Sequence, residues 1–146
     1  MSDADPTLAV PLVPGMIHRP EAPRHMMRIK PAERRVRVRL GQRTLAESTR
    51  ALRLIEIGRD VADPVLYLPL EDVVATLAES GRSTHCPLKG DTTYFDLADG
   101  TADAIGWSYT RPLPFAAELA GHIAFDAARV TFESAPPGED APSGDA

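Results

Sequence analysis

The sequence predicts a small, mainly β protein (β-rich α+β): a single antiparallel sandwich or barrel of seven or eight short strands with one or two short helices. Its 146 residues suffice for one compact domain and leave no room for two. The composition, with 43% hydrophobic and 25% charged residues, is that of an ordinary globular protein. Short alternating or apolar segments recur along the chain with turn residues between them, which favours strands over βαβ repeats.

The folded domain is expected over residues 32–133. Nine of the 14 prolines lie outside this range, whereas all eight aromatic residues lie inside it. Segments without aromatic side chains bury little apolar surface. We therefore expect residues 1–31 to form a basic, Pro-rich tail and residues 134–146 to form an acidic, Pro/Gly-rich tail.

Four strands are predicted in the first half of the domain. Over residues 35–40, arginines alternate with valine or leucine, which places the apolar side chains on a buried face and the arginines toward solvent. A glycine turn leads into a returning strand over residues 43–48. Residues 51–57 alternate again, and the apolar run at residues 65–68 lies between two prolines, as is typical of an edge or barrel strand.

A short helix and two strands are predicted next. Residues 70–79 carry acidic side chains in the first turn and end before a glycine, which predicts the helix. Residues 83–98 are rich in β-forming side chains, and an Asp-Gly turn separates them from a further β segment over residues 104–110. These two segments are expected to pair.

A second short helix is predicted over residues 114–120, because a proline stands at its first position and a glycine follows its end. Residues 123–125 and 130–132 then close the domain as two β segments.

Cysteine usage and the N-terminus bear on the compartment. Cys86 is the only cysteine, so no disulfide can form within the chain and a reducing compartment is the simplest interpretation. The first residues are acidic where a secretory signal is basic, and no segment approaches the roughly 20 apolar residues that span a bilayer. We expect a soluble cytoplasmic protein with no membrane partner.

Positive charge is concentrated in residues 18–43, which hold nine Arg or Lys against two Glu, although the whole chain has a net charge of −5. Such an arm can bind nucleic acid or acidic lipid, or it can fold back on the acidic body. No aromatic side chains are interleaved in it to stack on bases, so we do not expect a nucleic-acid partner.

Two clusters of side chains are candidates for chemistry. In the first, His85 and Lys89 flank Cys86, and either could lower the pKa of the thiol and make it a nucleophile. The alternative is that Cys86 is a small buried apolar residue and Lys89 pairs with an acid. In a strand, His85 and Cys86 would point to opposite faces.

The second cluster is Trp107, Tyr109 and Arg111. In a strand these three share a face, so they could form one wall of a pocket with the guanidinium group placed to meet an anion. The alternative is that both aromatic side chains belong to the core.

The sequence predicts no metal and no cofactor. No two histidines have the helical spacing of a zinc motif, although His85, His122 and an acid such as Glu118 could still meet in space. Glycine-rich phosphate loops and the nucleophile elbow of hydrolases are missing as well.

Several segments, in this order along the chain, resemble domain-of-unknown-function family 427. The resemblance spans roughly residues 34–132, and its C-P-x-K-G and A-G-x-I-A-F-like motifs are quite specific. It implies a small β-rich fold of the β-tent type, and the family carries a nucleotidyltransferase label. The segments are residues 47–52, 67–73, 84–90, 107–109 and 118–125.

The nucleotidyltransferase label finds little support in the residues. A polymerase-like enzyme of this class needs paired carboxylates that hold Mg²⁺ against a triphosphate, and no such pair is evident. β-Tent relatives often bind zinc through CxxC pairs, and one cysteine cannot supply these. Candidate acids are present only by proximity: Asp91, Asp96, Asp99 and Asp103.

We therefore expect the protein to bind a small anionic or aromatic, nucleotide-like ligand in a cleft. Two alternatives stay open: an enzyme, either a nucleotidyltransferase or a transferase that uses the Cys86 thiol, and a protein-interaction module that uses the basic N-terminal arm. The sequence assigns no catalytic residue and no oligomeric state. Because they match motifs of the family or lie in phase with them, the expected ligand-binding residues are Tyr67, Cys86, Lys89, Trp107, Tyr109 and Arg111.

Overall fold

The computed structural model describes residues 15–136 of the chain. They form an all-β domain with two short 3₁₀ turns, which confirms the predicted fold class. The strands are β1 (Ile17–Arg19), β2 (Ala22–Pro31), β3 (Arg35–Leu40), β4 (Arg43–Ser48), β5 (Leu52–Ile57), β6 (Val65–Pro69), β7 (Leu77–Glu79), β8 (His85–Cys86), β9 (Gly90–Leu97), β10 (Gly106–Pro112), β11 (His122–Phe125) and β12 (Thr131–Ala135), and the turns are η1 (Leu70–Asp72) and η2 (Pro114–Leu119).

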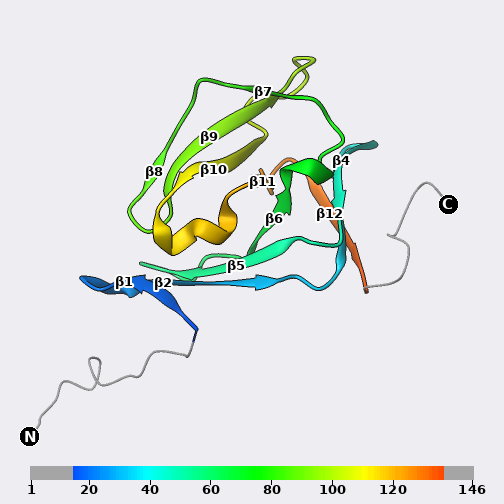
Figure 1. Ribbon diagram of the computed structural model, residues 1–146. Helices are drawn as coiled ribbons and strands as arrows, with labels where there is room; N and C mark the ends of the chain where they lie inside the picture. Colours follow the sequence, from blue (N-terminus) through cyan, green and yellow to red (C-terminus); the bar gives the residue numbers. More distant parts are fainter. Residues whose placement is uncertain (1–14, 137–146) are drawn as a thin grey trace, which may run out of the picture.

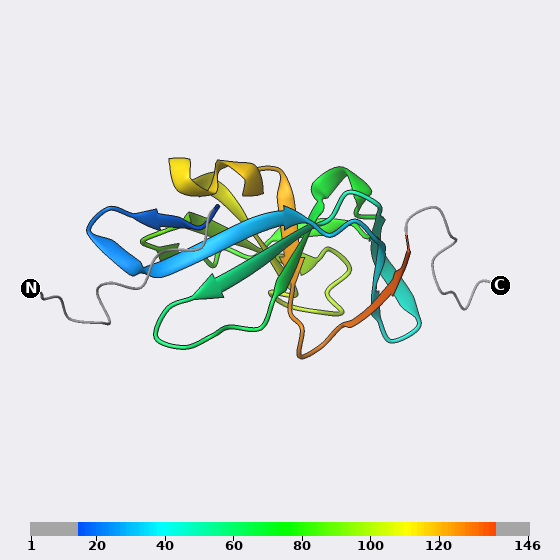
Figure 2. The ribbon, with the colours of Figure 1, turned by 90° about the horizontal axis from the view of Figure 1, so that it is seen from below.

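Two antiparallel sheets make up the domain. A nine-stranded sheet has the order β1-β2-β5-β6-β11-β10-β9-β7, with β8 paired to β9, and a three-stranded sheet has the order β12-β3-β4. The large sheet curls, so that β1, β2 and β5 lie along one side of the molecule and β7 to β10 along the other (Figure 1). The three-stranded sheet stands at the end of the molecule far from β1 (Figure 2).

The interior consists of two hydrophobic clusters. One joins the three-stranded sheet to the curled sheet and includes the fully buried Val38, Leu45 and Leu68. The other lies inside the curl under η2 and includes Met27 and Tyr67. The second cluster is the one that carries polar groups of chemical interest.

The β3–β4 hairpin follows its predicted boundaries, but its arginines are not all turned to solvent. Arg37 is only 7% exposed, because both faces of the three-stranded sheet are partly covered. Arg37 Nε donates to Glu47 Oε1 at 3.0 Å, and Arg39 Nη1 donates to Glu133 Oε2 at 3.3 Å. Much of the basic arm thus folds back on acids of its own body, one of the two outcomes that its charge allowed.

The predicted helix over residues 70–79 is wrong. Only η1 forms there, and the chain then extends into β7. Two adjacent β-branched residues, Val73 and Val74, disfavour a helix, and Val73 instead forms a bridge with Ala46. The strand predicted at residues 65–68 exists as β6, but it is an interior strand between β5 and β11, with Pro69 at its end.

The expected N-terminal tail contains two strands. Residues 17–31 form β1 and β2, and β2 pairs with β5 from Met26 to Pro31 while Met27 is fully buried. At the other end β12 runs to Ala135, beyond the boundary expected at residue 133. The remainder of the two predicted tails, residues 1–14 and 137–146, lies outside the described residues. Within residues 15–136 no helix has the length and apolarity to cross a membrane.

Candidate functional site

A chain of three polar side chains connects the two sides of the curled sheet. Glu56 on β5 accepts a hydrogen bond from Lys89 Nζ to its Oε1 at 2.5 Å, and its Oε2 lies 2.6 Å from His25 Nε2 on β2. Lys89, immediately before β9, is only 8% exposed. One carboxylate therefore binds an ammonium group and an imidazole that come from opposite sides of the domain.

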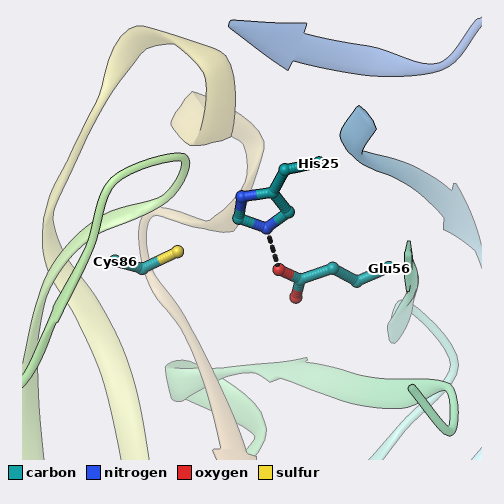
Figure 3. A group of neighbouring side chains, drawn as sticks. All are labelled: His25, Glu56 and Cys86. Atoms are coloured by element: carbon teal, nitrogen blue, oxygen red, sulfur yellow. Dashed lines mark hydrogen bonds and ion pairs between the residues drawn. The ribbon is translucent and has the colours of Figure 1, made fainter. Parts of the chain in front are cut away.

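Cys86 completes this group. A nitrogen of His25, a carboxylate oxygen of Glu56 and the Cys86 Sγ all lie within 4.8 Å of one another. Figure 3 shows the sulfur pointing from β8 toward the His25–Glu56 pair. The group brings together a thiol, an imidazole and a carboxylate at partly buried positions.

The ionisation of this group follows from its contacts. Burial opposes the charge on Glu56, but the hydrogen bonds and charges of His25 and Lys89 outweigh it and hold the pKa of Glu56 below its ordinary value of 4.5. Burial likewise opposes the charge on Lys89, but Glu56 and the neighbouring Tyr67 raise the pKa of Lys89 above 10.5. Both residues are therefore charged at neutral pH.

Three aromatic side chains, which contact one another, form an aromatic group beside Lys89. Tyr67 and Tyr109 are buried with ring centroids 6.4 Å apart, and the Trp107 indole donates to the Tyr67 hydroxyl at 3.3 Å. Lys89 Nζ lies 5.5 Å from the centroid of the Tyr109 ring, within the range of a cation–π contact. Burial is the main cause that raises the pKa of both tyrosines, so their hydroxyls stay protonated.

Tyr67→Phe is expected to cost about 1 kcal/mol of unfolding free energy, because it leaves the Trp107 N–H without its acceptor. Trp107 is the only tryptophan, so its fluorescence in a denaturant titration reports both the stability and the changed surroundings of the indole. Tyr94→Phe is the matched control. The Tyr94 ring neighbours Trp107, with ring centroids 6.0 Å apart, but its hydroxyl does not accept the indole hydrogen. Equal effects of the two substitutions would contradict this hydrogen bond.

An open pocket of about 830 Å³ reaches His25 and Glu56 from the solvent side. It lies between the β1–β2 turn and the segment that follows β5, and alanine, proline and glycine contribute much of its wall. Its lining residues are Glu21, Ala22, Pro23, Arg24, His25, Glu56, Gly58, Arg59, Asp60 and Ala62.

A second pocket, of about 390 Å³, is smaller and more polar. Its walls include Arg50 and Asp72, and these charges are engaged with each other or with neighbouring acids and hydroxyls. This pocket contains none of the six predicted ligand-binding residues, although most of its lining comes from the family-like segments at residues 47–52 and 67–73.

The structure brings together five of the six predicted ligand-binding residues. Lys89 is bound to Glu56, and Cys86 packs in one hydrophobic cluster with the three aromatic side chains; none of the five lines the open pocket. Trp107 and Tyr109 lie on one side of β10, as expected. Arg111 is exposed, and within residues 15–136 no hydrogen bond or ion pair joins its side chain to this group.

The other candidates of the sequence lie elsewhere. His85 is exposed and its Nδ1 lies 2.6 Å from Asp91 Oδ1, on the opposite face from Cys86. His122 Nδ1 lies 2.9 Å from the backbone oxygen of Ala120, and the described part of the chain does not join it to His85. Asp96 accepts from the backbone of Ala104 at 2.6 Å, which gives it a role in the turn.

Sequence reasoning missed His25 and Glu56. His25 fell in a segment interpreted as a tail. Glu56 could have been found, because it lies two residues after the buried Leu54 and thus on the inner face of a strand, where an acid needs a partner.

Comparison with protein families identifies a match over most of the chain. A family model described as a domain of unknown function (DUF427), with the short name NTP_transf_9, matches residues 28–135. No curated protein matches the chain.

Proposed function

The chain belongs to the DUF427 family, whose description names no function, and we propose from the geometry of its site that it binds a small organic anion. The ligand occupies the open pocket and meets the chain formed by Lys89, Glu56 and His25 at its inner end. The observation that carries this proposal is a partly buried ammonium–carboxylate–imidazole chain that reaches an open pocket.

The carboxylates that line the pocket are engaged with protein groups, which leaves its donors for an anion. Of the three, Glu21 is paired with Arg19 and Glu56 with Lys89, and Asp60 accepts a hydrogen bond from the backbone N–H of Val61. Arg59 and His25 are donors at the rim and at the inner wall, respectively. Carbon-rich walls between them suit an apolar or aromatic body, so the ligand class is an aromatic or aliphatic carboxylate or phosphate.

A purely structural role explains the polar chain less well. A buried ion pair seldom stabilises a fold more than apolar side chains of the same volume do, because its desolvation cost offsets the attraction. Charged groups held in a partly buried cluster beside a pocket are more typical of a binding or catalytic site. The buried Tyr67 and Tyr109 support this role by holding the Lys89 ammonium group in place.

The alternative functions have unequal support. Cys86 near His25 is compatible with thiol-dependent transfer, in which the imidazole would accept the thiol proton. Among the described residues, the group that could hold a metal contains a single carboxylate, which gives nucleotidyl transfer no added support. The single cysteine at this site is also in keeping with a cytoplasmic, reducing location.

Arg59→Ala is expected to weaken binding of a small anion roughly five-fold, as the loss of about 1 kcal/mol from a partly exposed ion pair requires. Isothermal titration calorimetry of the purified chain measures the change in affinity with two probes: benzoate, which carries a carboxylate, and AMP, which carries a phosphate. Arg53→Ala is the matched control. Arg53 is an exposed arginine on β5, the strand that precedes Arg59, but it does not line the pocket. If neither probe binds at millimolar concentration, or if both variants bind like the wild type, this function is wrong.

A further inference from the structure

We propose that His25, Glu56 and Cys86 form a binding site for a divalent metal ion of the zinc type, with one coordination position open to the pocket. This proposal does not depend on the proposed organic ligand, since the metal would bind to the protein alone.

The three donors have the right chemistry. Imidazole nitrogen, carboxylate oxygen and thiolate sulfur are the ligands that zinc takes in proteins, and they come here from β2, β5 and β8. Three protein ligands with a fourth position left open is the arrangement of reactive zinc sites and not of closed structural ones. Because the three strands are far apart in sequence, the fold itself brings these atoms together.

The geometry needs little adjustment. Zinc bonds of about 2.0 Å to nitrogen or oxygen and about 2.3 Å to sulfur place neighbouring donors roughly 3.3 to 3.8 Å apart around a tetrahedral ion. The donor atoms of the three residues already lie within 4.8 Å of one another. An ion would replace the hydrogen bond between His25 and Glu56, which is 2.6 Å long, and draw the Cys86 sulfur inward.

Lys89 would act on the ion through Glu56. Its ammonium group donates to Oε1 of the carboxylate, which leaves Oε2 to face the metal and fixes the plane of the group. A divalent ion, a thiolate and a carboxylate sum to zero charge, and Lys89 adds one positive charge. An anionic fourth ligand, such as hydroxide or the carboxylate or phosphate of a substrate, would restore neutrality.

The open coordination position of the ion would face the pocket. His25 and Glu56 both line the inner wall of the pocket, while Cys86 approaches from the opposite side. The ion would therefore lie between the interior of the domain and the pocket, where water or a small anion reaches it.

Cobalt(II) titration of the metal-free, full-length protein tests this site. Cobalt–thiolate bonds absorb in the near ultraviolet, and Cys86 is the only cysteine, so this absorption reports an ion bound to Cys86. We expect it to saturate at one ion per chain, to vanish in Cys86→Ser and to require at least about ten-fold more cobalt in His25→Gln. Zinc should abolish it by displacing the cobalt.

His85→Gln is the matched control, because His85 is the histidine next to Cys86 in sequence but lies on the other face. It should leave the titration unchanged. As a measurement that needs no variant, zinc should slow the alkylation of wild-type Cys86 by iodoacetamide at least about ten-fold. No absorption at millimolar cobalt, absorption that is insensitive to His25→Gln, or a thiol that zinc does not protect would overturn the proposal, and a fast-reacting unprotected thiol would point to thiol chemistry instead.

Discussion

Gly90→Ala is expected to destabilise the protein by about 4 kcal/mol, the largest effect of any single methyl group added to this site. Gly90 has φ of +111°, which a residue with a side chain adopts only under strain. A Cβ atom there would lie 2.4 Å from the backbone oxygen of Arg111 and 2.7 Å from the nitrogen of Leu113. That nitrogen donates to the Lys89 carbonyl oxygen at 2.9 Å, so the clash would also displace Lys89.

Gly100→Ala separates the two causes of this loss, which are backbone strain at positive φ and the steric clash of the added Cβ atom. Gly100 also has positive φ, +82°, but a Cβ atom there would meet no atom within 4 Å. Its substitution should cost only about 1 kcal/mol, the backbone strain alone. Denaturant unfolding of both variants, followed by Trp107 fluorescence, measures the difference. Similar losses in both would contradict the close backbone approach at Gly90.

Lys89→Met is expected to cost about 3 kcal/mol, because it leaves the Glu56 carboxylate partly buried without its ammonium partner. Glu56→Gln should have a comparable cost, since it leaves Lys89 charged among aromatic rings. The double variant should lose at least about 1.5 kcal/mol less than the two single losses combined. Arg50→Met, which breaks an exposed pair with Glu71, should cost much less than either of these single changes and serves as the control.

The same pair predicts a pH dependence. The pKa of Glu56 is lower in the folded state than its ordinary value of 4.5, so the carboxylate contributes stability above pH 4.5, and this contribution is lost as the pH falls through the lower folded value. The pKa of Lys89 is raised above 10.5, so its contribution is present below pH 10.5 and disappears as the pH rises through the folded value. Denaturant unfolding of Glu56→Gln should therefore depend less on pH in the acidic range than unfolding of the wild type does. Additive single losses and parallel pH curves would contradict a coupled pair.

Most of the fold could be predicted because local pattern and tertiary structure agree. The alternation of polar and apolar residues over residues 35–40 and 51–57 encodes strands with one inner face. A proline at the first position and a glycine after the end mark η2. The helix over residues 70–79 failed where β-branched side chains and a bridge to β4 override the acidic first turn. β2 was missed because its apolar residues are separated by prolines and cations, and only pairing with β5 buries them.

The site was half predictable. Lys89, Cys86, Trp107 and Tyr109 lie in motifs whose residue types stand out along the chain, whereas their partners come from distant strands. His25 and Glu56 join them only through the curl of the sheet, which sequence spacing does not encode. A prediction from one sequence could name the thiol and the ammonium group and could mark Glu56 as an acid on an inner strand face, but it could not place the three in one site.

An NMR titration of the ¹⁵N-labelled protein with benzoate locates a small anion on the molecule. We expect the perturbed amides to concentrate at residues 21–25 and 56–62, around the pocket that reaches His25 and Glu56. Perturbations centred on residues 47–50 and Asp72, the walls of the second pocket, or spread over the basic arm would contradict it.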